Sequence, residues 1–471
     1  MTAELRDLAV LGMGVMGANL ARNFASRGLS VTVYNREPSV AQKLLSDHPE
    51  AKFYNAPTLA DMVRSLSRPR RIVLMVTAGA AVDSVLDALD PLLEEDDIVV
   101  DAGNSLYSDT DRRNARADTR PWRFVGMGVS GGAEGALLGP SIMPGGDVEA
   151  WTRLRPALEA IAAKSSSGAC VAYCGKASAG HFVKMVHNGI EYGDMQLIAE
   201  TSTLLRDGLG LQAGAVADTF ANWNQGDLES FLIEITRDIF RTADPTKKTG
   251  ELLVDAILDK AGQKGTGKWT VIAALELGVP IPTIAAAVDA RGLSSQKSLR
   301  VESEKAFAPA KKPLAGVSVD DLRDALYASK IASYTQGFAM LQAASAERGY
   351  GTDMSEVARI WTAGCIIRAR FLDRVQKAFA TKPSLLALAP EFVEDLRKRT
   401  PGWRRVVTAA TASGLPIPGL SASLAWFDTL STARGNANVI QAQRDYFGSH
   451  TYERADAPGV SVHTEWPRFT K

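Results

Sequence analysis

The chain of 471 residues has three cysteines, five histidines and no excess of charge of either sign. Three cysteines are too few for the disulfide framework of a small secreted domain. Lysine plus arginine equals aspartate plus glutamate, at 53 each, which argues against nucleic acid or an anionic membrane as the main partner. The sequence has no apolar run long enough to span a bilayer, and no signal-peptide pattern precedes the strand-like run at Leu8. We therefore expect a cytoplasmic protein.

Metal-binding patterns are also sparse. Cys170 and Cys174 lie four residues apart, which suits a redox or metal pair, but the sequence offers no second Cys/His pair to complete a zinc site. We interpret both as small buried thiols and expect no bound metal.

The first 177 residues alternate short apolar runs with helical patterns. Strand-like runs occur at residues 8–11, 31–34, 72–76, 98–101 and 124–127. This rhythm predicts an α/β domain of the Rossmann type, with a doubly wound parallel sheet and helices on both faces. We expect this domain, residues 1–177, to bind a dinucleotide.

The pattern changes after residue 177. Long amphipathic patterns follow at residues 178–208, 214–241, 250–260, 266–278, 318–348 and 354–380. They predict a large all-α domain over residues 178–434. Residues 435–471 show no strong period after Tyr446, and we expect an extended C-terminal tail that packs on something other than its own sheet.

A glycine fingerprint connects the first strand to the first helix. Its residues are Gly12, Met13, Gly14, Val15, Met16 and Gly17. The first glycine permits a tight turn, the second lets the backbone approach a pyrophosphate, and the third lets helix and strand pack closely. A structural glycine turn is the alternative, but the strand–turn–helix context favours nucleotide binding.

The end of the second strand bears on the choice of cofactor. An NAD site usually has a carboxylate there for the ribose 2′-hydroxyl, whereas this chain has Asn35 and Arg36, which suit a 2′-phosphate. The adjacent Glu37 would repel that phosphate unless its side chain turns away. The sequence favours NADP and leaves NAD open.

A second glycine-rich stretch covers residues 126–146. Ser130, Gly131 and Gly132 follow a predicted strand end there, where backbone N–H groups can bind an anion. A flexible loop is the alternative, but the carboxyl edge of a parallel sheet favours a ligand contact.

The run of residues 180–192 concentrates polar groups on one helix face. Lys184, His187, Asn188 and Glu191 fall within a sector of about 100°. Any one of them alone would more often be structural or solvated, and His181 is read as structural. Their convergence indicates a catalytic face, because a lysine in a closed cleft beside a nucleotide can have a lowered pKa and act as a base.

Residues 262–270 look like a phosphate loop. Trp269 stands where the ATP-hydrolysing pattern has the serine or threonine that holds magnesium, and no strand precedes the loop, so we reject ATP hydrolysis. Lys264 and Thr266 can still bind a phosphate monoester by charge and N–H donation.

These segments together resemble the 6-phosphogluconate dehydrogenase (decarboxylating) family. Further matching segments are residues 101–105, 139–146 and 443–453, so the resemblance covers nearly the whole chain. It implies a homodimer whose tail reaches into the partner subunit and completes a shared active site. It also implies oxidation of 6-phospho-D-gluconate by NADP to ribulose 5-phosphate, CO2 and NADPH, in the pentose phosphate pathway and gluconate utilization.

The resemblance assigns roles to individual residues. Lys184 would be the base at the 3-hydroxyl and Glu191 the acid that protonates C1 of the enediol. The substrate would be held by Asn104, Ser130, Gly131, Gly132, His187, Asn188, Tyr192, Lys264, Thr266 and Arg291, with Arg444 and His450 from the partner subunit. The cofactor would contact residues 12–17, Asn35, Arg36, Val76, Thr77 and Asn104.

Three positions depart from the family pattern. Family members usually have lysine at Thr77, glutamate at Ala133, and threonine or serine at Glu37. Two alternatives therefore stay open. One is a related β-hydroxyacid dehydrogenase, such as a hydroxyisobutyrate dehydrogenase or an imine reductase. The other is a non-catalytic nucleotide-binding relative.

Overall fold

A computed structural model describes residues 4–247, 250–308, 310 and 312–467 of the chain. It divides into two compact units, Met1–Ser423 and Leu424–Lys471. The ends of the first predicted domain and of the predicted tail, residues 1–3 and 468–471, lie outside the described residues. The predicted boundaries at residues 177 and 434 stay predictions.

The N-terminal part of the first unit is built on a seven-stranded sheet of order β3-β2-β1-β4-β5-β6-β7. The strands are Leu8–Leu11 (β1), Val31–Tyr34 (β2), Tyr54–Asn55 (β3), Arg71–Leu74 (β4), Ile98–Asp101 (β5), Arg123–Val129 (β6) and Ile142–Gly146 (β7). The Rossmann-type prediction is confirmed. The sheet is not wholly parallel, however, because β7 pairs antiparallel with β6. The sequence hides β7 because its last three residues are Pro, Gly and Gly, which are depleted in strands.

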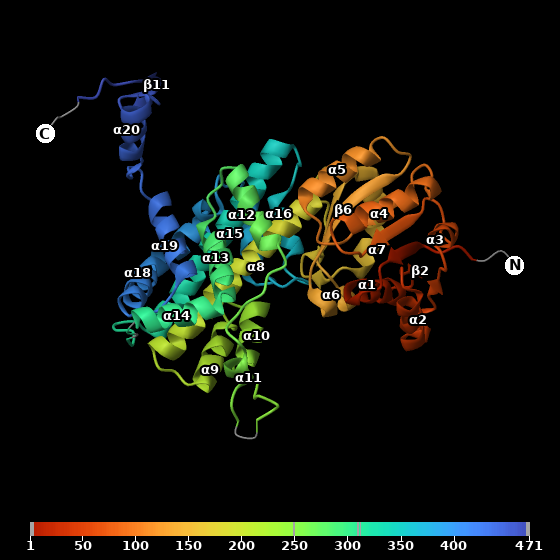
Figure 1. The fold of residues 1–471 in the computed structure, drawn as a ribbon, viewed down its shortest axis with the longest axis horizontal. Coiled ribbons are helices and arrows are strands. Elements are labelled where there is room, and N and C mark those ends of the chain that lie inside the picture. Colours follow the sequence, from red (N-terminus) through yellow and green to blue (C-terminus); the bar gives the residue numbers. More distant parts are fainter. Residues whose placement is uncertain (1–3, 248–249, 309, 311, 468–471) are drawn as a thin grey trace. The chain divides into compact units, whose positions relative to one another are not determined.

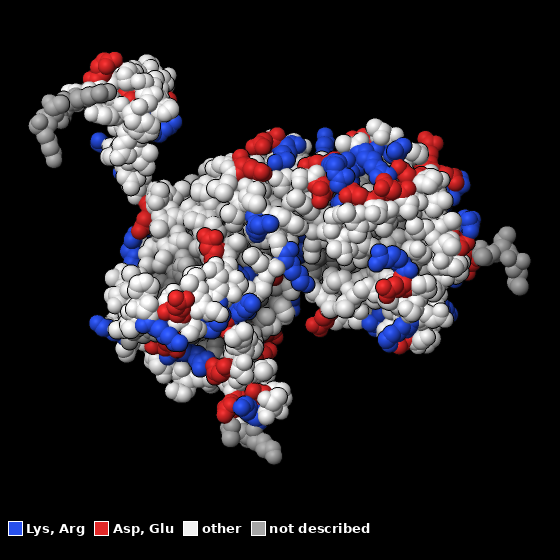
Figure 2. Space-filling view, viewed as in Figure 1, with Lys and Arg blue, Asp and Glu red and all other residues white. Residues whose placement is uncertain are grey.

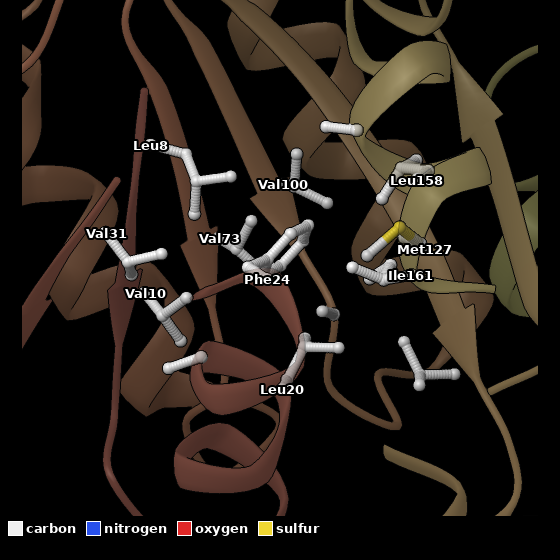
Figure 3. Close-up of a cluster of buried hydrophobic side chains, with 14 of the residues drawn as sticks. Leu8, Val10, Leu20, Phe24, Val31, Val73, Val100, Met127, Leu158 and Ile161 are labelled. Carbon is white, nitrogen blue, oxygen red and sulfur yellow. The ribbon is translucent and has the colours of Figure 1, made fainter. Parts of the chain in front are cut away.

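Helices cover both faces of this sheet (Figure 1). They are Val15–Ser26 (α1), Pro38–Asp47 (α2), Leu59–Arg64 (α3), Ala80–Leu89 (α4), Tyr107–Ala117 (α5), Gly132–Leu138 (α6) and Val148–Ile161 (α7). On one face, Phe24 of α1 and Leu158 of α7 pack on Val10 and Val100 of the sheet (Figure 3). On the other face, α3 and α4 cover the alternate residues of the same strands. Because successive side chains of each strand point to opposite faces, the sheet has an apolar core on each side.

A short antiparallel pair of strands, Lys164–Ser165 (β8) and Gly168–Ala169 (β9), follows α7. From residue 179 on, the rest of the first unit is helical, as predicted. Its helices are Ala179–Thr203 (α8), Ala213–Trp223 (α9), Phe231–Ile239 (α10), Leu253–Ala256 (α11), Thr266–Glu276 (α12), Pro282–Ser295 (α13), Lys297–Phe307 (α14), Val319–Arg348 (α15), Met354–Ile360 (α16), Phe371–Ala380 (α17), Pro390–Ala412 (α18) and, crossing the boundary between the two units, Pro418–Leu430 (α19). The two long central helices, α8 and α15, are buried along most of their length and pack on each other. A capping box between Ser318 and Asp321 fixes the start of α15.

Two predicted helices prove to be interrupted. The pattern over 214–241 divides into α9 and α10, and the pattern over 354–380 divides into α16 and α17. The second break holds Gly364, whose φ of 67° lies in the left-handed region, which favours glycine and is incompatible with a continuous helix. The predicted helix over 250–260 is reduced to the single turn of α11.

The second unit corrects the prediction of an extended tail. Residues Ala437–Gly448 form a helix (α20), and Tyr452–Arg454 (β10) and Ala457–Val462 (β11) form an antiparallel hairpin. Asp445 joins them by accepting hydrogen bonds from the backbone N–H groups of Thr451 and Thr464 and from the indole of Trp466. Although burial would raise it, these bonds and His463 lower the pKa of Asp445 to about 2.

Positive and negative side chains are interspersed over the face of the molecule seen in Figure 2. Among the described residues, none of the helices is both long and apolar enough to cross a membrane. All three cysteines are buried and free, which confirms the interpretation of Cys170 and Cys174 as small buried thiols.

Candidate active site

Glycines bring α8 against β6 and β7. An added Cβ at Gly128 of β6 would lie 2.4 Å from Cβ of Lys184, and one at Gly180 would lie 2.3 Å from the carbonyl oxygen of Gly126. An added Cβ at Gly145 of β7 would lie 2.3 Å from the backbone nitrogen of Gly180. These contacts leave no space for a side chain, so the sequence fixes both the depth and the rotation of α8 on the sheet.

The predicted polar face of α8 converges as expected. His187 is fully buried, and its Nε2 lies 3.3 Å from Oγ of Ser130, which follows β6. Its Nδ1 lies 3.1 Å from Oδ1 of Asn188 and 3.8 Å from a carboxylate oxygen of Glu191. Lys184 is 7% exposed one turn earlier on the same helix. Four groups from one helix and one from the sheet edge therefore line the same space.

Burial shifts the pKa values of Lys184, His187 and Glu191 toward their neutral forms. Burial lowers the pKa of the Lys184 amine, with Glu191 opposing that change. Burial raises the pKa of Glu191, while Lys184 and Arg291 act to lower it. Burial and the neighbouring Lys184 take the pKa of His187 well below its ordinary value, so the imidazole is neutral at pH 7. The site can therefore offer an amine base and a carboxylic acid together.

The predicted anion site at the end of β6 is a turn with two left-handed glycines. Gly131 and Gly132 have φ values of 105° and 65°, and they begin α6. Ser130 is 2% exposed, and the Gly132 position is exposed. Successive N–H groups in such a turn form a concave site for a carboxylate.

The interrupted segment between α16 and α17 supports this site, and the sequence analysis missed it. The carbonyl oxygen of Gly364 accepts a hydrogen bond of 2.8 Å from Ser141 and leaves no room for a Cβ at Gly131. The indole of Trp361 meets His187 edge-on, with ring centroids 5.4 Å apart. Cys365 interacts with Lys184, although burial raises the pKa of its thiol to about 12. Gly364 inside a helical pattern was the available signal.

The predicted phosphate loop also reaches α8. Gly267 lies against Tyr192, where an added Cβ would be 2.6 Å from the ring, and Thr270 donates to the carbonyl oxygen of Met185. The guanidinium of Arg291 on α13 stacks on the ring of Tyr192 at 3.6 Å.

Helix α12 begins at Thr266, and Lys264 lies two residues before it. The start of α12 and the guanidinium of Arg291 thus meet at Tyr192, the residue after Glu191, which suits a dianionic phosphate.

The glycine fingerprint has the geometry that its spacing predicts. An added Cβ at Gly12 would lie 2.5 Å from the carbonyl oxygen of Met75, and one at Gly17 would lie 1.9 Å from that of Gly12. At Gly14, the N-cap of α1, an added Cβ would have every described neighbour more than 4 Å away. Gly12 and Gly17 thus close the turn, whereas Gly14 leaves space for a ligand at the helix start, where Val15 and Met16 form the first turn.

A cavity of about 650 Å³ adjoins this turn. Its lining includes Asn35, Arg36, Glu37, Val76 and Thr77. The amide oxygen of Asn35 accepts a hydrogen bond of 2.9 Å from the Met13 backbone, so Asn35 shapes the glycine turn. Arg36, Glu37 and Thr77 are exposed. The cavity and the open Gly14 position fit a dinucleotide, and Arg36 is the group that suits a 2′-phosphate.

Asn104 is exposed in the loop after β5, and a buried network fixes that loop. Arg113 of α5 is fully buried and bonds Asp101 of β5, Asp83 of α4 and the carbonyl oxygen of Gly79. It therefore joins the loop that carries Thr77 to the loop that carries Asn104.

Two predicted substrate residues belong to the second unit. Arg444 lies on α20 and bonds Gln441, and His450 follows that helix and packs on Phe447. Their predicted entry into the substrate site stays a prediction. Within the described residues, no group of three or more His, Cys, Asp or Glu side chains is placed to hold a metal.

The chain matches two family models. Residues 7–175 match the NAD binding domain of 6-phosphogluconate dehydrogenase, and residues 180–466 match the 6-phosphogluconate dehydrogenase C-terminal domain. A decarboxylating 6-phosphogluconate dehydrogenase of Synechocystis is 51% identical over 98% of both chains. The NADP-dependent decarboxylating enzyme of Bacillus subtilis is 48% identical over 98% of this chain and 99% of its own.

A solved structure extends the match to three dimensions. The 6-phosphogluconate dehydrogenase of Plasmodium falciparum, described in its apo form and in complexes with NADP and with 6-phosphogluconate, is 41% identical. It superposes with a TM-score of 0.94 and covers 98% of this chain and 100% of its own. With the glycine turn, the polar face of α8 and the phosphate loop all in place, the chain belongs to the 6-phosphogluconate dehydrogenase family.

Proposed function

We propose that this protein converts 6-phospho-D-gluconate and NADP into ribulose 5-phosphate, CO2 and NADPH, as an enzyme of the pentose phosphate pathway. The observation that carries this function is the pair of the buried Lys184 and the half-buried Glu191 on one face of α8, next to a dinucleotide-binding sheet. We infer a cytoplasmic location, on the three buried, free cysteines.

Lys184 acts first, as a base. Its lowered pKa favours the neutral amine, which removes the proton of the 3-hydroxyl while the hydrogen on C3 leaves as hydride. NADP supplies the hydride acceptor when it is bound. The product of this step is a 3-keto acid, and the proton stays on Lys184.

Decarboxylation then uses the same proton. Lys184 returns it to the 3-keto oxygen as the C1–C2 bond breaks, so the electron pair forms an enediol and CO2 leaves. Glu191, whose pKa is raised by burial, gives a proton to the carbon that becomes C1 of the product. Lys184 recovers the hydroxyl proton, and transfer of one proton from Lys184 to Glu191 restores the starting state.

Binding follows the arrangement of charges. The N–H groups of the Ser130–Gly132 turn hold the carboxylate, and Asn104, His187 and Asn188 hold hydroxyls. Tyr192, Lys264, Thr266 and Arg291 hold the phosphate, supported by the contact of Arg291 with Tyr192.

For the cofactor, residues 12–17 hold the pyrophosphate at the start of α1. Asn35 and Arg36 hold the adenosine part, while Val76, Thr77 and Asn104 lie toward the nicotinamide. Glu37 beside Arg36 reduces the preference for a 2′-phosphate, so we expect NAD to be accepted as well.

We further propose a homodimer in which Arg444 and His450 complete the substrate site of the partner subunit. Mixing Lys184→Ala protein with Arg444→Ala protein tests this, because mixed dimers would contain one intact site. Partial recovery of activity is expected. No recovery, after mass spectrometry has verified subunit exchange, contradicts a shared site.

The deciding experiment is an initial-rate assay with 6-phosphogluconate and each cofactor, with CO2 release measured in parallel. Stoichiometric CO2 and NADPH are expected. Turnover of an unphosphorylated hydroxyacid but not of 6-phosphogluconate would instead favour a related β-hydroxyacid dehydrogenase. Binding without turnover would favour a non-catalytic relative.

A further inference from the structure

A buried ion pair lies one helical turn beyond Glu191. Nζ of Lys330 on α15 is 2.5 Å from Oδ2 of Asp194 on α8, and the two side chains are 6% and 3% exposed. The hydroxyl of Tyr334, one turn after Lys330, lies 3.0 Å from the same carboxylate oxygen. The ammonium of Lys330 also faces the ring of Tyr334 at 4.7 Å. We call these three residues, Asp194, Lys330 and Tyr334, the cluster.

The cluster is linked to the interrupted segment that supports the active site. The hydroxyl of Tyr334 lies 3.3 Å from the carbonyl oxygen of Ile367. Earlier in that segment, Trp361 contacts His187 and Gly364 lies under Gly131. The cluster therefore connects the helix of the proposed acid to the segment against which the proposed substrate groups pack.

Stability alone does not account for a charged pair at this depth. Removing two ions from water costs several kcal/mol for each ion, and well-packed apolar residues of similar volume are often about as stable. A buried pair does, however, fix the relative position of the elements that carry it, because sliding would leave a charge unpaired. Here those elements are α8 and α15.

The cluster also acts on Glu191 electrostatically. The groups that face Glu191 are Lys184 and His187 on its own helix, Asp194 on the next turn, Arg291 from α13 and Tyr334 from α15. Burial is the main cause of the raised pKa of Glu191, and Asp194 raises it further, whereas Lys184 and Arg291 lower it. Burial also raises the pKa of Tyr334, which keeps its hydroxyl protonated.

We propose that Asp194, Lys330 and Tyr334 are positioning residues of the active site, which hold the segment 361–367 against α8 and keep a carboxylate behind the acid Glu191. This inference rests on the proposed function, since it assigns the cluster to the proton donation by Glu191. Asp194 acts through its charge, Lys330 keeps that charge buried and in place, and Tyr334 holds the segment.

The charge is tested by the pH dependence of kcat. Asp194→Asn removes the carboxylate and leaves the Lys330 ammonium unopposed, and both changes lower the pKa of Glu191. Because the acid must be protonated, kcat should begin to fall at a lower pH than in wild type. If the pKa of Glu191 decreases by one unit, kcat on the alkaline limb should be about tenfold below the wild-type value at the same pH. In the neutral variant Asp194→Asn/Lys330→Gln, the alkaline fall of kcat should begin at a pH between those of wild type and Asp194→Asn.

The matched control is Asp324→Asn on the same helix α15, which breaks a part-buried ion pair with Arg399 of α18. It should leave the alkaline limb unchanged. A cluster with only a structural role would lower kcat equally at every pH. The proposal is overturned if folded Asp194→Asn protein and wild type give the same alkaline limb.

A smaller change tests the segment, including the case in which Asp194→Asn does not fold. Tyr334→Phe removes only the hydroxyl, so we expect faster amide hydrogen exchange in residues 361–367 and kcat about fivefold lower, as for one lost hydrogen bond. Unchanged exchange and unchanged kcat would overturn the positioning role. Failure of wild type to convert 6-phosphogluconate is a separate result, because the exchange experiment needs no turnover.

Discussion

The proposed catalytic face of α8 and the proposed cofactor edge of the sheet are built in opposite ways. Around Lys184, the backbone of β6 and β7 approaches the helix so closely that added Cβ atoms at Gly128, Gly145 and Gly180 would overlap their neighbours. At the cofactor edge, Arg36 and Glu37 project into an open cavity, and the Gly14 position is unobstructed.

This difference places the residues proposed for proton transfer in a tightly packed region and those proposed for cofactor choice in an open one. The shifted pKa values of the proposed base and acid, Lys184 and Glu191, come mainly from burial, so they depend on the packing of several elements at once. Arg36 and Glu37, which we propose bear on the choice between NADP and NAD, are exposed, so we expect their replacement to disturb little else. The following predictions test that separation.

Lys184→Ala is expected to have the largest effect. Without the amine, the 3-hydroxyl has no base and the keto oxygen no proton donor, so kcat should fall by about 10³-fold or more. Absorbance of NADPH at saturating substrate measures it. The control is Lys43→Ala, which breaks an exposed pair with Asp47 and should retain full activity. Retention of more than a tenth of the wild-type kcat would count against Lys184 as the base.

Glu191→Gln should reduce kcat about 10²-fold and remove its alkaline limb. Because the proposed acid Glu191 must be protonated and burial raises its pKa, we expect wild-type activity to be lost as pH rises through that raised value. Lys184 must be neutral, so activity is also lost as pH falls through its lowered pKa. The variant should keep the acid limb. A persistent alkaline limb in Glu191→Gln would assign that limb to another group.

A pair of glycine variants compares the two regions directly. Gly128→Ala places a Cβ against Lys184 and should destabilise the protein by about 1–3 kcal/mol, with lost activity. Gly14→Ala meets no described atom within 4 Å and should unfold like wild type, but with a raised KM for NADP. Thermal unfolding and steady-state kinetics measure both. Equal melting temperatures for the two variants would contradict the difference in packing between the Gly128 and Gly14 positions.

Glu37→Thr should have the smallest effect. Removing a carboxylate a few ångströms from a 2′-phosphate at a solvated site changes its interaction by about 1 kcal/mol, which is about fivefold. The ratio of kcat/KM for NADP to that for NAD should rise by that factor, with kcat unchanged. The isosteric Glu37→Gln separates charge from size, and an unchanged ratio in both would show that Glu37 turns away from the phosphate.

Local patterns were enough for much of this structure. The turn of residues 12–17 and the convergence on α8 follow from short-range periodicity, because both lie within one strand–helix unit or one helix. The phosphate loop was recognised from its composition, but its contact with α8 depends on Thr270 and Gly267, which no local pattern reveals.

The missed features depend on long-range contacts. The antiparallel strand β7 is stabilised by pairing with β6 and by the approach of α8, although its Pro-Gly-Gly end has poor strand propensity. The break at residues 361–370 exists because Gly364 must lie under Gly131, more than 200 positions earlier in the chain. The Asp194–Lys330 pair joins two helices whose separate patterns read as ordinary amphipathic helices.

The buried Arg113 has a consequence for how the cofactor cleft opens. Because one guanidinium bonds the carbonyl oxygen of Gly79, the carboxylate of Asp101 and the hydroxyl of Ser105, the two loops that it joins cannot loosen independently. Local fluctuation of either loop requires the loss of several charge-assisted bonds at once. We therefore expect the wall of the cleft that carries Thr77 and Asn104 to open as one cooperative unit.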